Sequence, residues 1–181
     1  MKNGSIRVMT RIALMSALLC ICAWVTIPGA VPFTLQTLGV FLALGLLGPR
    51  DGALAILVYL LLGAVGLPVF SGFKGGVGVL LGATGGYLVG FLVSAVPYGL
   101  VTRLPGNRLL VTGVGFLAVL LVSYVFGTAW FLLVYTRTAG PVTLGAVLGW
   151  CVWPFLLPDA AKLALALLLT DRLRKVLPEI K

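Results

Sequence analysis

Apolar residues run through this chain in long stretches, and glycine, proline or charged residues end each of them. Six such stretches cover residues 12–27, 35–47, 53–67, 79–101, 109–135 and 142–170. A helix that spans a bilayer needs roughly 17–25 mostly apolar residues. The pattern therefore predicts an all-α integral membrane protein with six transmembrane helices, forming a single membrane domain over residues 1–181.

Composition supports a membrane protein. The chain is 61% hydrophobic and only 9% charged, whereas soluble domains carry about 25% charged residues. Basic residues precede the first apolar stretch, as they do in a signal peptide. However, Pro28 and Gly29 end that stretch, and no small-residue cleavage site precedes a soluble region. We therefore interpret it as the first span.

Basic residues are distributed unequally between the two predicted sides. Ten of the thirteen lysines and arginines share the side of the N-terminus, and only Lys74 and Arg137 lie on the other, with Lys162 inside the last stretch. Cytoplasmic loops carry an excess of Lys and Arg, so we expect both termini in the cytoplasm and the protein in the cell membrane. This distribution explains the net charge of +9 through the lipid surface, without a nucleic-acid partner.

An acid and a base interrupt the last apolar stretch, within PFLLPDAAKLALALLL. Asp159 and Lys162 are three residues apart and would share one helix face. Pro158 suits the first turn of a helix, which predicts a new helical segment beginning near Asp159. A charge in mid-membrane costs about 2.5–3.5 kcal/mol, so the pair should face the protein interior. Two interpretations remain: the pair binds a ligand, or it is an ion pair that joins two helices.

Short second and third spans, flanked by irregular segments, are typical of a substrate site in a membrane protein. One flanking segment, VPFTLQTLG, contains Thr34 and Gln36, which either cap a helix or hydrogen-bond a ligand. The other is glycine-rich, runs from Gly66 to Tyr87, and has no nucleotide-binding loop pattern. Its glycines either allow backbone to approach a ligand or serve turns and close helix packing.

The residue inventory argues against an enzyme. The chain has no histidine, and of its four acidic residues only Asp159 lies within a predicted span. Its three cysteines lie in apolar surroundings and suit packing better than zinc binding. We therefore expect no metal and no cofactor. A self-sufficient carrier or channel is the alternative function, although carriers typically contain two repeated halves and none is evident here.

Two segments resemble one family. The stretch from Val31 to Leu92 and the motif WPFLLPDAAK, Trp153 to Lys162, are similar to the BioY proteins, which are biotin-binding S-components of energy-coupling factor (ECF) transporters. The resemblance extends from about Arg11 to Lys175. Ala83 stands where we expect proline, and Pro158 stands where we expect a small residue. Neither departure removes a polar group.

The resemblance implies the six-helix S-component fold, with biotin bound near the outer face. It implies that Asp159 and Lys162 contact the polar end of biotin, and Lys162 would meet either the ureido ring or the carboxylate. A close relative such as dethiobiotin is an alternative ligand. The remaining residues expected at the substrate site are Thr34, Gln36, Phe73, Lys74, Gly75, Gly76 and Tyr87.

The resemblance also implies partners. Small residues four apart form a smooth ridge on a helix, and Ala13 and Ala17 have this spacing. They would dock onto a transmembrane coupling subunit that is driven by two cytoplasmic ATPase subunits. The S-component would then turn within the bilayer and expose its site inward.

Overall fold

The computed structural model describes residues 2–29 and 31–176, and Ala30 and the tail residue Lys181 lie outside this range. Helix α1 spans Lys2–Trp24. A small antiparallel pair of strands follows, in which β1 (Thr26–Ile27) pairs with β2 (Phe33–Thr34). This hairpin leads the chain directly into α2 and brings the polar segment after Pro32 into the centre of the fold.

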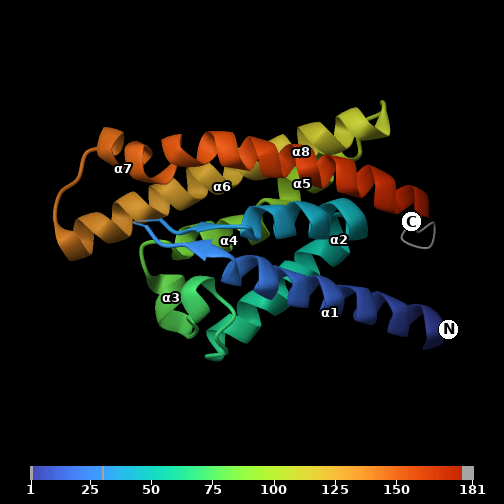
Figure 1. The fold of residues 1–181 in the computed structure, drawn as a ribbon, viewed down its shortest axis with the longest axis horizontal. Helices are drawn as coiled ribbons and strands as arrows, with labels where there is room; N and C mark the ends of the chain where they lie inside the picture. The colour runs from blue at the N-terminus through green and yellow to red at the C-terminus, as the bar shows by residue number, and fades with distance from the viewer. Residues whose placement is uncertain (1, 30, 177–181) are drawn as a thin grey trace.

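Helix α2 spans Gln36–Ala64 and contains the second and third predicted spans. Gly48 breaks it, with backbone angles of φ 83° and ψ 176°, and Pro49 follows. A positive φ is accessible to glycine without a steric cost. The two halves then pack closely, since a side chain at Gly52 would overlap the backbone of Ala43 and Leu44. Figure 1 shows the change of direction within α2.

The fourth predicted span is divided rather than continuous. A short 3₁₀ turn, η1 (Ser71–Phe73), precedes α3 (Val77–Leu81), and α4 (Gly85–Val93) and α5 (Ala95–Val101) follow. Gly82 is extended and ends α3. A side chain at Gly85 would overlap the Leu80 carbonyl, so the chain turns tightly here. The expectation of one helix over residues 79–101 is therefore wrong at its start.

Helix α6 spans Arg108–Ala139, with the Asn107 side chain accepting a hydrogen bond from Leu109 N–H at its start. Helix α7 (Leu144–Cys151) and helix α8 (Trp153–Val176) follow. The expectation of a new helix near Asp159 is wrong, because α8 begins at Trp153 and contains Pro158 within it. Pro154 takes the place in the first turn that the sequence suggested for Pro158.

Four segments are long and apolar enough to cross a membrane: Ser5–Trp24, Gln36–Ala64, Arg108–Ala139 and Leu144–Val176. The kink at Gly48 divides one of them into two, and Gly85–Val101 forms a shorter apolar segment. Together these make six segments, in agreement with the predicted all-α membrane fold. Helix α1 begins and α8 ends at the same end of the molecule (Figure 1).

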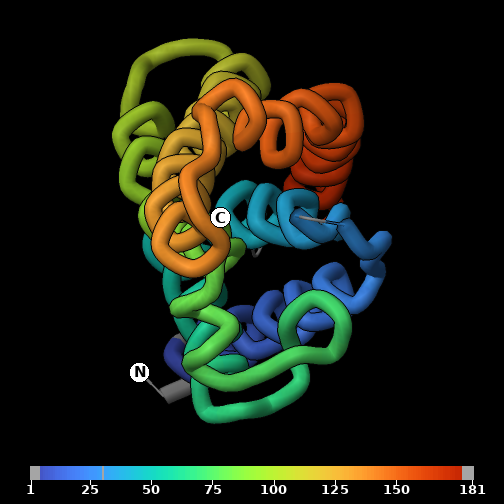
Figure 2. The backbone as a smooth tube through the Cα atoms, turned by 90° about the vertical axis from the view of Figure 1, so that its left-hand side faces the viewer, coloured from blue at the N-terminus to red at the C-terminus, as the bar shows by residue number. Residues whose placement is uncertain are grey.

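Helix α2 lies at the centre and packs against α1, α5 and α8, while α4 packs against α6. Figure 2 shows the loop between α2 and α4 lying beside α1, away from α7 and α8. Phe116 joins the core elements by stacking on Phe41 (ring centroids 4.9 Å apart) and Tyr98 (5.8 Å). One face of α6 is exposed and apolar, as a lipid-facing surface requires; it carries Leu110, Val114, Leu117, Leu121 and Val125.

Candidate ligand-binding site

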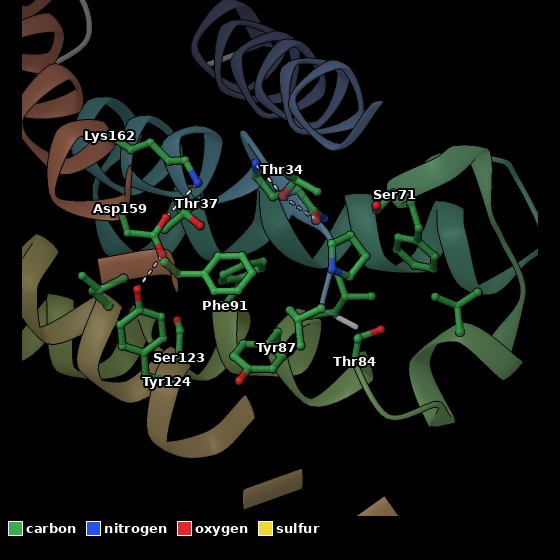
Figure 3. A pocket seen from close by; sticks show the side chains of 18 of the residues that line it. Thr34, Thr37, Ser71, Thr84, Tyr87, Phe91, Ser123, Tyr124, Asp159 and Lys162 are labelled. Carbon is green, nitrogen blue, oxygen red and sulfur yellow. Dashed lines mark hydrogen bonds and ion pairs between the residues drawn. The ribbon is translucent and has the colours of Figure 1, made fainter. Parts of the chain in front are cut away.

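A cavity of about 110 Å³ lies where the β-hairpin, the loop after α2, and helices α4, α6 and α8 meet. By volume it has room for several water molecules or part of a small ligand. Figure 3 shows Asp159, Lys162 and Tyr124 at one end and Ser71 and Thr84 at the other. Three regions that the sequence marked as irregular or polar therefore meet at one place.

The acid–base pair forms the charged end of the cavity. Lys162 Nζ lies 2.8 Å from Asp159 Oδ1, and both side chains are buried. Their spacing of three residues on α8 aligns them on one helix face. Because the two charges pair with each other, they satisfy the requirement that buried charges be paired and hydrogen-bonded. Both residues also line the cavity.

Two aromatic residues that sequence analysis missed complete this end. The Tyr124 hydroxyl donates to Asp159 Oδ2 at 2.7 Å, and Lys162 Nζ lies 4.1 Å from the centroid of the Phe33 ring. Such a cation–π contact stabilises a desolvated ammonium group. One sequence signal could have identified Tyr124: together with Ser123 it forms a pair of adjacent polar residues inside a long apolar stretch. Phe33 lies in the segment VPFTLQTLG, next to Thr34, but no pattern there indicated a contact with Lys162.

The polar residues of VPFTLQTLG lie at the cavity wall. Thr34 and Gln36 both line it and are buried. The Thr34 hydroxyl donates to Gln36 Oε1 at 3.2 Å, and Gln36 Nε2 donates to the Tyr59 hydroxyl at 2.6 Å. Thr37, one residue further, also lines the cavity. The Gln36 amide is thus fixed in orientation before any ligand arrives.

The glycine-rich loop contributes residues other than those expected. Lys74 lines the cavity, together with Phe70 and Ser71. Phe73 does not: it is 64% exposed and stacks on Trp24, with ring centroids 5.4 Å apart. Its φ of 56° turns it out of the loop.

Gly75 and Gly76 lie outside the cavity lining and shape the loop instead. A side chain at Gly75 would overlap the carbonyl oxygens of Leu67 and Gly66. Gly76 has a φ of 95°, and its N–H donates to the Gly63 carbonyl at 2.7 Å. Both glycines therefore let the loop return against the end of α2, which places Lys74 and Phe70 at the cavity.

Apolar and aromatic side chains form the middle of the cavity. Tyr87 lines it, and its hydroxyl lies 3.1 Å from Thr128 Oγ1. Leu88, Phe91 and Leu120 add apolar surface. The site thus offers a charged end, an apolar centre and a hydroxyl-rich far end. This arrangement suits reversible binding of a small molecule that carries polar groups on an apolar frame.

Helix α1 presents the predicted docking ridge outward. Ala13 and Ala17 are exposed, whereas the neighbouring Ser16 is buried and donates to the Ala55 carbonyl at 2.9 Å. The ridge therefore does not pack within the described part of the chain.

No group of three or more His, Cys, Asp or Glu side chains suited to a metal occurs among residues 2–29 and 31–176.

Known proteins resemble this chain along almost its whole length. The BioY family model matches residues 1–179. A biotin transporter BioY of Thermotoga maritima is 39% identical over 173 residues, covering 94% of this chain and 97% of the relative. A probable biotin transporter BioY of Pyrococcus horikoshii is 40% identical over 164 residues, covering 90% and 93%.

A solved structure has the same fold. The crystal structure of the S-component for biotin from an ECF-type ABC transporter superposes with a TM-score of 0.83 at 27% identity. The match covers 97% of this chain and 94% of that one. Together with the match to the family model, this shows that the chain belongs to the BioY family.

Proposed function

We propose that this protein is the biotin-binding S-component of an ECF-type importer in the cell membrane. The observation that carries the proposal is the buried Asp159–Lys162 pair at a cavity inside a membrane domain. The chain also belongs to a family whose relatives are named as biotin transporters, which supports the assignment. Those relatives are transporters and not enzymes, in line with the expectation from the sequence.

Biotin has the groups that this cavity can bind. Its ureido ring carries two N–H donors and one carbonyl acceptor. Asp159 can accept from an N–H group and Lys162 can donate to the carbonyl, so the pair matches both at once. The bicyclic ring and its thioether would then lie against Tyr87 and Phe91. The valerate carboxylate would extend toward Ser71, at the opposite end from the ion pair in Figure 3. Lys74, three residues further along the same loop, also lines the cavity and could pair with it.

Transport against a gradient needs energy from another protein, because the sequence has no nucleotide-binding loop pattern. We assign this role to a transmembrane coupling subunit with two cytoplasmic ATPase subunits. The exposed small residues Ala13 and Ala17 on α1 are the proposed docking ridge, since they allow another helix to approach closely.

Mass spectrometry of ligand that co-purifies with the detergent-solubilised protein tests the proposal directly. We expect biotin to be released on denaturation, and calorimetry on ligand-free protein to give one binding site per chain. Dethiobiotin and lipoate serve as comparison ligands. A protein that binds no biotin, or binds lipoate equally well, would contradict the proposed function.

A further inference from the structure

A second cavity, of about 290 Å³, lies at the opposite end of the molecule from the β-hairpin. It lies between the start of α6 and the end of α8, which meet at one end in Figure 1. Its lining contains three cations and one carboxylate, Arg108, Arg174, Lys175 and Asp171, together with Thr112 and Thr170. The described lining therefore has an excess of positive charge.

The single carboxylate is already paired. Asp171 Oδ2 lies 2.5 Å from Lys175 Nζ. Neither Arg108 nor Arg174 forms an ion pair with a carboxylate among residues 2–29 and 31–176. Two guanidinium groups at one cavity repel each other, and an anion between them would remove that repulsion.

Arg174 is held in place by neutral groups. Its Nη1 donates to Thr112 Oγ1 at 3.2 Å, and its Nη2 donates to the Gly45 carbonyl. These contacts fix the guanidinium beside the cavity without a direct ion pair to a carboxylate of the described residues. Thr170, also in the lining, is 1% exposed, and its hydroxyl has no hydrogen-bond partner among the described residues. Arg108 is the first residue of α6, where the helix end adds partial positive charge.

We propose that this cavity binds a phosphate group, with Arg108, Arg174 and Lys175 as its cationic contacts. Guanidinium groups bind phosphate oxygens through paired hydrogen bonds. The surroundings suit the headgroup of an anionic phospholipid as well as a free phosphate. Leu109 and Leu167 line the cavity, and the adjacent Leu110 and Leu168 are more than 60% exposed and can contact acyl chains. Biotin plays no part in this proposal.

Calorimetry on delipidated full-length protein in an uncharged detergent, at constant ionic strength, tests the site with three probes. These are dihexanoyl-phosphatidylglycerol, dihexanoyl-phosphatidylcholine and inorganic phosphate. We expect phosphatidylglycerol to bind at one site and phosphatidylcholine at least tenfold more weakly. Binding of inorganic phosphate as well would identify a free anion as a second source of the phosphate group, and its absence would identify the lipid as the sole source.

A pair of variants locates the site. Arg108→Gln with Lys175→Gln changes two exposed side chains of the lining and should weaken phosphatidylglycerol binding at least tenfold. Arg103→Gln with Arg172→Gln removes the same charge at exposed positions outside the lining and should bind like the parent. No binding to the parent, equal binding of the two lipids, or equal losses in both double variants would overturn the proposal.

Discussion

At the residue scale, the central feature is an ion pair in which both groups are already hydrogen-bonded before a ligand binds. Asp159 accepts from Lys162 through one oxygen and from Tyr124 through the other. A buried ion pair adds little net stability, because the cost of desolvation offsets the attraction. Its position at a cavity is better explained by recognition, since both groups retain hydrogen-bonding capacity for a ligand.

We expect Asp159→Asn and Lys162→Ala each to weaken biotin binding roughly ten- to a hundredfold, because a hydrogen bond to a charged group contributes about 1.5–3 kcal/mol. Calorimetry on purified variants measures the change. Asp171→Asn and Lys175→Ala remove an exposed ion pair elsewhere on α8 and are the matched controls. Unchanged affinity in both site variants would exclude recognition by the pair. Loss of folded protein would instead favour a structural role for the pair, which lies on α8 and is linked to α6 through Tyr124.

Tyr124→Phe isolates the second hydrogen bond to Asp159. Without the hydroxyl, Oδ2 loses its donor and the carboxylate is less firmly oriented toward the cavity. We expect biotin affinity to fall about tenfold, while the unfolding temperature in detergent changes little. Tyr135→Phe is the control, because this tyrosine stacks on Phe131, packs against Trp150 and does not line the cavity. Equal affinities for the two variants would show that Tyr124 does not position Asp159.

At the element scale, the loop between α2 and α4 owes its path to glycine backbone and its position to contacts with α1 and β1. Trp24 stacks on Phe73, and Trp24 Nε1 donates to the Pro68 carbonyl at 2.9 Å. Thr26 Oγ1 lies 3.1 Å from Ser71 Oγ. These contacts hold the loop beside α1, so that Phe70, Ser71 and Lys74 reach the cavity from one side.

Gly75→Val and Gly76→Val should therefore alter biotin association and dissociation rates. Valine at 75 would overlap two carbonyl oxygens, and valine at 76 would have to adopt a φ of 95°. Strain of this kind costs on the order of 1–3 kcal/mol. Gly78→Val is the control, because Gly78 has open space around it and no positive φ. Stopped-flow measurements showing parental rates in both test variants would separate the loop from binding.

At the scale of the whole molecule, the exposed apolar surface differs from place to place in the size of its side chains. The outer face of α6 carries large side chains suited to lipid, such as Leu121 and Val125. Helix α1 exposes the small residues Ala13 and Ala17 beside larger ones such as Leu14, and the alanines allow another helix to approach closely. The proposed docking ridge and the biotin cavity are formed by different elements, which predicts that they can be disrupted separately.

Ala13→Trp with Ala17→Trp should abolish ATP-driven biotin uptake in proteoliposomes and prevent co-purification of the coupling subunit, because the bulky rings block close helix approach. Biotin affinity of the isolated protein should remain unchanged. Ala160→Trp with Ala164→Trp places the same bulk at exposed positions four residues apart on α8 and is the matched control. Normal assembly and uptake by the α1 variant would place the docking surface elsewhere.

The sequence by itself determined the class of fold, because apolar length and helix-breaking residues act locally. The break at Gly48 and Pro49, the separate apolar segments and the shared face of Asp159 and Lys162 all follow from spacing along the chain. The polar residues Thr34 and Gln36 could also be placed near a site, since polar groups entering a span must find partners inside the protein.

Only the tertiary structure decided which residues meet. Tyr124 reaches Asp159 across 35 positions of sequence, and Gln36 reaches Tyr59 across 23. Phe73 was expected at the cavity but lies outside it, because stacking on Trp24 turns it away. Such outcomes depend on competing long-range contacts, whereas a sequence pattern reports only preferences between near neighbours. The membrane makes this difference between sequence and tertiary structure larger. It requires apolar segments to be helical, but the packing between helices determines which side chains become partners.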